Sequence, residues 1–292
     1  MYVSAPQVSF FTDARLRAVV GPLLTAYLLL PLLATAAAPA ASLDQGYRLM
    51  YDLHFDSSQH EFLQWQTEHP GDPLGPVSEA ANLLFSEFER LGVLEAQFFV
   101  KDSSFAGRKQ LLPDPDLRAR FDAELNRAEG EARQRLAEDA QNHDSLFALA
   151  LVYGLKADYA ALIEKRNLAA LGYTRQASEF ASKLLAVAPN YYDAYLATGI
   201  GKYIVGSAVA PVRWILQIAG YTADKKKGIQ ELKRTAENGR FLGPFARILL
   251  AVAYLRQKDR QQARLLLVGL RDEFPSNPLF SREILRIDGR QD

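Results

Sequence analysis

The chain has 292 residues, 49% of them hydrophobic and 23% charged, which is the composition of a folded protein and not of a disordered one. Its 34 lysine and arginine residues balance 34 aspartate and glutamate residues, so charge gives no indication of nucleic-acid binding. The absence of cysteine excludes disulfides, thiolate metal sites, cysteine nucleophiles and a lipid-modified N-terminal cysteine.

The N-terminal residues 1–40 have the order of an export signal. Arg15 and Arg17 precede an uncharged apolar run, and small residues follow it. This order is typical of a secretory signal peptide, here with cleavage after Ala40. Residues 18–41 are also long enough to form an uncleaved membrane anchor. In both cases we expect residues 41–292 to lie outside the cytoplasm, in the periplasm or at the cell envelope, because the positive flank stays inside.

Beyond residue 42 the apolar residues are spaced as in helices. One row over 117–136 recurs at steps of three and four, and Asp114-Pro115 before it supplies an N-cap and a first-turn proline. Another row over 77–91 ends at Gly92. Alternating strand patterns bounded by turns are absent from the sequence. The sequence therefore predicts an all-α protein.

Residues 244–277 contain the clearest internal repeat. Small residues at Ala251 and Ala263 would let two antiparallel helices approach closely, and Pro275 would end the second helix. With Leu250, Tyr254, Leu267 and Leu270, they reproduce the tetratricopeptide repeat (TPR) pattern over its full period. The region thus predicts one complete helix pair.

The same spacings recur upstream, which predicts five helix pairs and a final short helix from Asn277. Two of the units, at 153–177 and 202–228, are longer than the motif, and each surplus would fit a helix extension or one additional helix. In the second surplus we expect a helix from Pro211 that ends before Gly220. The expected fold is a right-handed, TPR-like helical-repeat solenoid with inserted or extended helices.

The stretches APVRWILQIAGYTADKKKGIQEL and ARLLLVGLRDEFPSNPLF resemble the C-terminal half of the eukaryotic tetratricopeptide repeat protein thirty-nine family, which includes the yeast inclusion-body clearance proteins. Gly220-Tyr221 and Gly228-Ile229 occupy the family's turn and helix-start positions, whereas Ala223 replaces its usual glycine. The resemblance covers about a third of the chain and implies a helical scaffold without catalytic residues. The export signal departs from the family, so its cytosolic roles are not transferred.

The sequence offers no catalytic or metal-binding pattern. His54, His60 and His69 lack the spacing of a zinc pair on one helix face. The Gly199–Lys202 segment lacks the glycine spacing and the preceding strand of a phosphate loop, and the repeat register places Gly199 in a contact between helices. We therefore expect no enzyme activity, no cofactor and no metal ion.

Two groups of residues are candidates for partner binding. A charged cluster in an extended unit fits either a solvated helix surface or part of the concave surface of a solenoid; it comprises Lys156, Asp158, Tyr159, Glu164, Lys165 and Arg166. An aromatic group has the residue types enriched at binding hot spots; it comprises Tyr191, Tyr192, Tyr195, Tyr203, Arg213 and Trp214. Tyr195 also fits the aromatic position of the motif itself, and Trp214 also fits a core. Lys165, Arg166 and the aromatic group are the predicted partner-binding residues.

The leading hypothesis is a non-enzymatic, exported TPR scaffold that binds a protein or peptide in its concave groove. The alternative is a membrane- or lipid-associated helical-repeat protein that uses the apolar segment 204–220, although burial under neighbouring repeats would accommodate that segment equally well. The sequence identifies neither the partner nor the oligomeric state.

Overall fold

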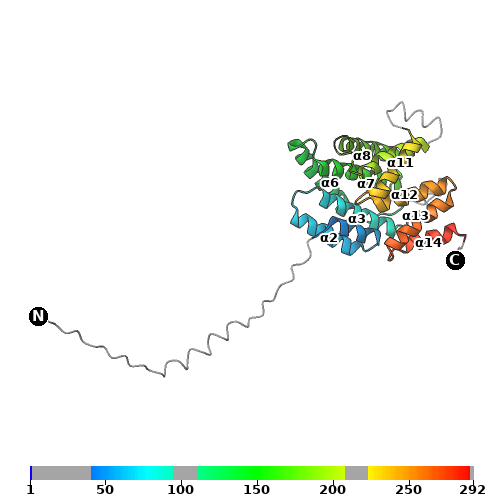
Figure 1. Cartoon of the computed structure of the whole chain (residues 1–292), viewed down its shortest axis with the longest axis horizontal. Coiled ribbons are helices and arrows are strands. Elements are labelled where there is room, and N and C mark those ends of the chain that lie inside the picture. The colour runs from blue at the N-terminus through cyan, green and yellow to red at the C-terminus, as the bar shows by residue number, and fades with distance from the viewer. Residues whose placement is uncertain (2–40, 95–110, 208–222, 290–292) are drawn as a thin grey trace, which may run out of the picture. The chain divides into compact units, whose positions relative to one another are not determined.

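The computed structural model describes Met1 and residues 41–94, 111–207 and 223–289 (Figure 1). The contacts divide the chain into Met1–Ala40 and Ala41–Asp292, and every described helix belongs to the second unit. Eleven α-helices and no strand occur in the described residues. The all-α prediction is therefore confirmed.

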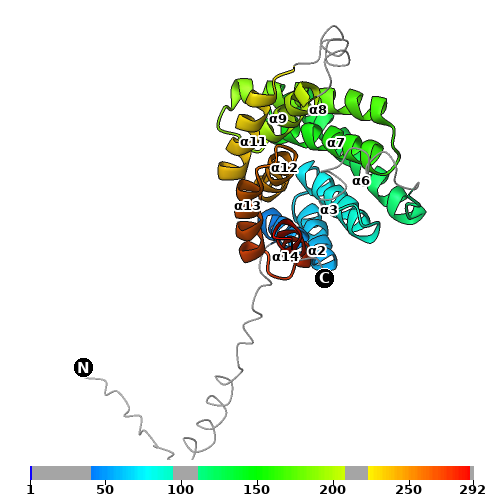
Figure 2. The same cartoon turned by 90° about the vertical axis from the view of Figure 1, so that its right-hand side faces the viewer.

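The helices pack in chain order as pairs, α1 with α2, α3 with α6, α7 with α8, α9 with α11 and α12 with α13, and α14 packs on α13. Their bounds are α1 Leu43–Tyr51, α2 Phe55–Glu68, α3 Leu74–Arg90, α6 Pro115–Glu138, α7 His143–Leu162, α8 Asn167–Val187, α9 Ala194–Ser207, α11 Lys225–Asn238, α12 Gly243–Arg256, α13 Arg260–Glu273 and α14 Pro278–Ile287. Figures 1 and 2 show the pairs following one another from α2 to α14. The described part of the chain thus has the predicted five pairs and final short helix, a helical-repeat solenoid.

Local signals define the helix ends as the sequence indicated. The Asp114 carboxylate accepts hydrogen bonds from the backbone N–H groups of Asp116 and Leu117, at 2.9 and 3.2 Å, and so caps α6. Gly92, just beyond α3, has a φ of 65°, a conformation that favours glycine. Both predicted boundaries are confirmed.

The clearest repeat forms the predicted helix pair. Ala251 on α12 and Ala263 on α13 are buried, as are Leu267 and Leu270. Both alanines are enclosed, so neither position has room for a larger side chain unless its surroundings shift.

The first surplus in the sequence is a helix extension and not an additional helix. Helices α7 and α8 have 20 and 21 residues, whereas α12 and α13 have 14 each. The second surplus includes the helix expected from Pro211, and it lies outside the described residues.

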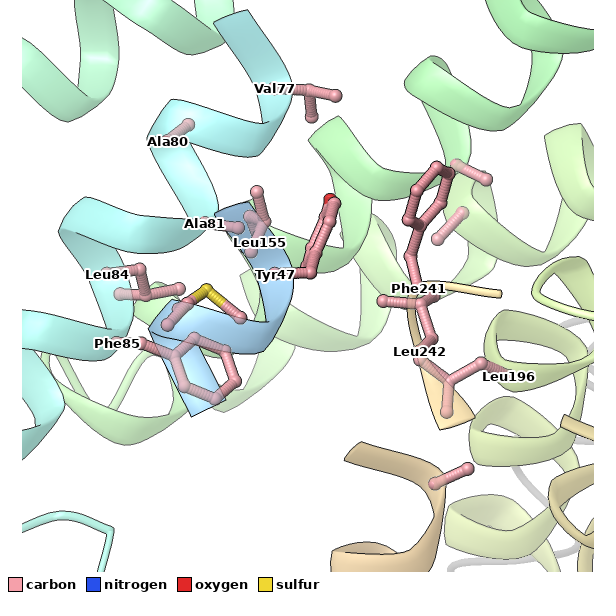
Figure 3. Packing of buried hydrophobic residues seen from close by; sticks show 14 of the residues in the cluster. Tyr47, Val77, Ala80, Ala81, Leu84, Phe85, Leu155, Leu196, Phe241 and Leu242 are labelled. Atoms are coloured by element: carbon pink, nitrogen blue, oxygen red, sulfur yellow. The ribbon is translucent and has the colours of Figure 1, made fainter. Parts of the chain in front are cut away.

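Helix α1 connects the two ends of the array. The Tyr51 hydroxyl donates to the Phe241 carbonyl at 3.1 Å, and the Asn277 side-chain amide donates to the Tyr51 carbonyl at 2.8 Å. The Tyr47 ring stacks on Phe241 with centroids 4.9 Å apart, and Figure 3 shows Tyr47 between the α3 side chains and Phe241. In an open solenoid each unit contacts only its neighbours. Here the first helix also contacts the segments that precede α12 and α14.

Candidate functional site

The first helices of successive pairs form the inner surface of the array, where α3 contacts both α1 and α7, and α7 contacts α9. A cavity of about 80 Å³ lies on this surface among α1, α3, α7, α8, α9 and α12. Most of its walls are apolar or aromatic, with rings from Tyr47, Phe85, Phe147 and Phe245. A small, largely apolar and partly open cavity therefore lies next to α1.

Two carboxyl groups line this cavity, and the first, Asp193, is fully engaged in the fold. Its oxygens accept hydrogen bonds from the backbone N–H groups of Arg240, Phe241 and Leu242, at 2.9, 3.1 and 2.8 Å. Burial raises the pKa of Asp193, and these three hydrogen bonds oppose that rise by stabilising the carboxylate. Asp193 thus holds the turn before α12 against the start of α9.

The second carboxyl group, Asp158, has no comparable support. It lies on the face of α7 that also carries Phe147, Leu151 and Gly154, and all four residues line the cavity. Among the described residues nothing donates a hydrogen bond to Asp158 or forms an ion pair with it, and burial alone raises its pKa from 3.8 to about 7. A side chain at Gly154 would enter open space, since an added Cβ there meets no atom within 4 Å. Asp158 is therefore an unpaired acid on the wall of an apolar cavity.

A second, larger hollow lies between α8 and α9. It is a groove of about 430 Å³ with a mixed polar and apolar lining. The Ser178 hydroxyl donates to the Ala197 carbonyl at 2.9 Å and joins the two helices at its base. Lys202 in the lining pairs with Glu231 of α11 at 2.6 Å, and Ser182 on α8 is exposed. This groove is open enough to accept a segment of another chain.

The structure separates the predicted aromatic group into different environments. Tyr191 packs on Phe147 with ring centroids 4.9 Å apart, and burial raises its pKa. Tyr195 lies under the Arg234 guanidinium at 4.9 Å, and its ring centroid is 6.5 Å from that of Tyr192. Tyr191 is thus partly buried against the core, whereas Tyr192 and Tyr195 form a partly exposed pair beside α11.

The remaining members of that group are not brought together with this pair. The Lys225 ammonium lies over the Tyr203 ring at 5.8 Å. Arg213 and Trp214 lie outside the described residues, as does most of the segment 204–220. Ile204, at the described end of that segment, is 45% exposed. Partner binding by these residues stays a prediction, and so does membrane association of the segment.

The charged cluster divides in the same way. Lys156 pairs with Glu129 at 2.7 Å, and exposed Arg166 pairs with Glu164 at 3.3 Å, as expected for a solvated surface. Lys165 lies in the turn after α7, where its φ is 59°. Of this cluster only Asp158 lines the cavity, and the sequence analysis did not predict that position. Its place in an otherwise apolar row of α7 could have indicated that it faces inward.

The other sequence patterns have structural explanations. Gly199 on α9 lies against α11, because an added Cβ would come within 3.1 Å of the Gly228 carbonyl oxygen. The three histidines His54, His60 and His69 are exposed. In the ranges that the structure describes, no cluster of histidine and carboxylate side chains is suited to a metal ion.

One of the described helices, α7, is long and apolar enough to cross a membrane. Within its most apolar stretch, however, 72% of the residues are buried inside the protein. Its composition is therefore that of the central helix of the core, flanked by α3, α6, α8 and α9.

The chain is similar in structure to a solved TPR protein, whereas two other comparisons found nothing. No protein-family model matches the chain, and no curated protein matches it. The crystal structure of TTC0263, a thermophilic TPR protein from Thermus thermophilus, is similar over 84% of this chain and 98% of its own, with 16% sequence identity and a TM-score of 0.42. The resemblance to the thirty-nine family is not confirmed by these comparisons and stays a prediction.

Proposed function

We propose that residues 41–292 form a non-enzymatic, exported scaffold that binds a segment of a partner protein in the groove between α8 and α9. The open groove is the observation that carries this proposal, since its volume of about 430 Å³ is in the range of ligand-binding clefts. The concave groove expected from the sequence is a poorer place for a peptide, because the cavity of about 80 Å³ beside α1 is too small for one. The partner site is therefore proposed on the neighbouring α8–α9 face.

The character of the groove lining supports a peptide as the occupant. The exposed Ser182 can offer its hydroxyl to a peptide backbone, whereas the hydroxyls of Thr174 and Ser178 already donate to the Ala170 and Ala197 carbonyls and can only accept. Leu171 and Ile204, which is 45% exposed, offer apolar contact. The lining has three basic side chains, Arg175, Lys183 and Lys202, and one acidic side chain, Glu179. Arg175 pairs with Glu179 at 2.8 Å and Lys202 with Glu231 of α11 at 2.6 Å. Because most of its charges are paired, this surface suits a neutral polar segment better than a strongly charged polymer.

Site-specific photo-crosslinking tests this proposal in the native cell envelope. A photoreactive amino acid replaces Ser182 in the groove, and a matched control replaces Gln134 on α6, which is also exposed. We expect a discrete crosslinked protein from position 182 and none from position 134. The same adducts from both positions, or none from position 182, would count against the groove.

Export is the second part of the proposal, and the structure near the expected cleavage site is compatible with it. Ala41 is only 7% exposed, and its N–H donates to a Glu68 carboxylate oxygen at 3.2 Å. The Ser42 side chain caps α1 by accepting from the N–H of Gln45. Cleavage after Ala40 would leave these contacts intact and give Ala41 an ammonium group beside Glu68.

N-terminal sequencing of the fractionated protein checks this expectation. We expect Ala41 as the first residue of the exported protein, or a membrane-held precursor if residues 18–41 stay as an anchor. An intact, soluble cytosolic chain that begins at Met1 would contradict both forms of the export proposal.

A further inference from the structure

The scaffold proposal gives no role to Asp158, the unpaired acid on the wall of the cavity beside α1. We propose that it binds a small organic amine, in its ammonium form, with Asp158 as the counter-ion. This site adjoins the α8–α9 groove, with which it shares Thr174, but Asp158 lines only the cavity.

The first argument is the missing partner of Asp158. Asp158 is half-buried, and a carboxylate largely removed from water is normally paired or hydrogen-bonded, because leaving it without compensation is costly. Asp193 in the same cavity follows that rule with three backbone N–H donors. Asp158 has no donor among the described residues, so a ligand that brings both a positive charge and N–H groups would complete its interactions.

The second argument is the character of the walls. Rings from Tyr47, Phe85, Phe147 and Phe245 line the space around the acid. Aromatic faces attract organic cations, and the apolar walls favour the hydrocarbon part of an amine over a hydrated metal ion. At about 80 Å³, the cavity would take a compact amine and not a peptide.

The third argument is the charge around Asp158 from every neighbouring element. The titratable groups that also line the cavity are Tyr47 and Tyr51 of α1 and Asp193, before α9. Burial raises the pKa of both tyrosines, so they stay neutral. No lysine, arginine or histidine from the described part of α3, α7, α8, α9 or α12 lines the cavity. The described surroundings are therefore neutral or acidic and favour a cation.

The test uses the full chain and propylamine as the probe, with 1-propanol as the isosteric neutral control and propanoate as the anionic control. Titration calorimetry is done in phosphate buffer, since amine buffers would compete. We expect one propylamine per chain at pH 8, with weaker binding of the alcohol and none of propanoate. Absence of propylamine binding, or equal binding of the amine and the alcohol, would overturn the proposal.

The pH dependence identifies Asp158 as the counter-ion. A proton competes with the ammonium ion for the carboxylate, so the affinity should be constant between pH 7 and the pKa of the amine and fall about tenfold per pH unit below pH 7. Asp158→Asn, with an unfolding midpoint no lower than that of the parent as the check on folding, should lower the affinity at pH 8 at least tenfold and abolish this dependence. An unchanged affinity in the folded Asn variant would contradict the assignment.

Gly154 gives a test of the location that leaves Asp158 in place. Gly154→Ala adds a methyl group to open space and should keep binding, whereas Gly154→Leu should fill the cavity and remove it. Thermal unfolding of both variants verifies that they are folded. Propylamine binding that survives in folded Gly154→Leu would place the amine elsewhere and refute the site.

Discussion

Asp158 shows how a single residue can oppose the stability of the fold that contains it. Its pKa is raised from 3.8 to about 7, so the folded state binds a proton more tightly than the unfolded state does. Protonated Asp158 therefore stabilises the folded state fully below about pH 4. This contribution to the free energy of unfolding is lost as the pH rises through 7, because the folded protein must then hold a poorly solvated carboxylate. The physical cause is burial without a compensating donor.

We expect Asp158→Asn to be more stable than the parent protein at pH 8, by on the order of 2 kcal/mol after allowance for partial exposure to water in the cavity. The advantage should shrink steadily towards pH 4, where the parent carboxyl is protonated. Glu79, whose pKa burial also raises to about 7, is present in both proteins and cancels in the comparison. Urea unfolding across this pH range measures the difference, and a difference independent of pH would contradict the assignment.

At the scale of the element, the α12–α13 pair depends on two alanines. Ala263 is 0% exposed and Ala251 is 2% exposed, so the contact has no room for a larger group. Ala263→Leu should overpack the pair and lower the free energy of unfolding by about 1–3 kcal/mol.

The matched control is Gln261→Leu, at an exposed position in the first turn of the same helix. Leucine is a good helix former, so this variant should change the stability by less than about 0.5 kcal/mol. Thermal and urea unfolding of both variants give the comparison. Equal stabilities would mean that the repeat was aligned incorrectly.

The helices that the sequence predicted well are those with local signals. The N-cap at Asp114, the glycine at 92 and the small residues at 251 and 263 act within one helix or between consecutive helices. Their effects can be read from spacing alone. The elongation of α7 and α8 could not be distinguished from an additional helix, because both alternatives occupy the same length of chain.

The features that the sequence did not predict depend on contacts between distant segments. The hydrogen bond from Tyr51 to Phe241 spans 190 positions in the chain, and no periodicity indicates such a contact. The cavity depends on α1, α3, α7, α8, α9 and α12 together. Asp158 was grouped with its charged neighbours in sequence, although its helix face places it with Phe147 and Leu151.

At the scale of the whole molecule, the contacts of α1 distinguish this array from an open solenoid. Stability in an open array is close to a sum over neighbouring units, so its ends unfold independently. Here α1 also contacts the segments at 240–242 and 274–277, through aromatic packing and through hydrogen bonds of Tyr51. The first and last pairs should therefore unfold together. The cavity also depends on this arrangement, because α1 supplies part of its wall.

The most direct measurement of this arrangement is a pair of spin labels on Asp44 and Arg240, whose side chains form an ion pair at 2.6 Å. Both are partly exposed, at 45% and 64%, and the chain has no cysteine, so Asp44→Cys and Arg240→Cys supply the only thiols. Loss of such an exposed ion pair should cost little stability. We predict strong dipolar broadening in the frozen spectrum of the doubly labelled protein. A spectrum equal to the sum of the two singly labelled proteins would contradict the placement of α1, and with it the cavity.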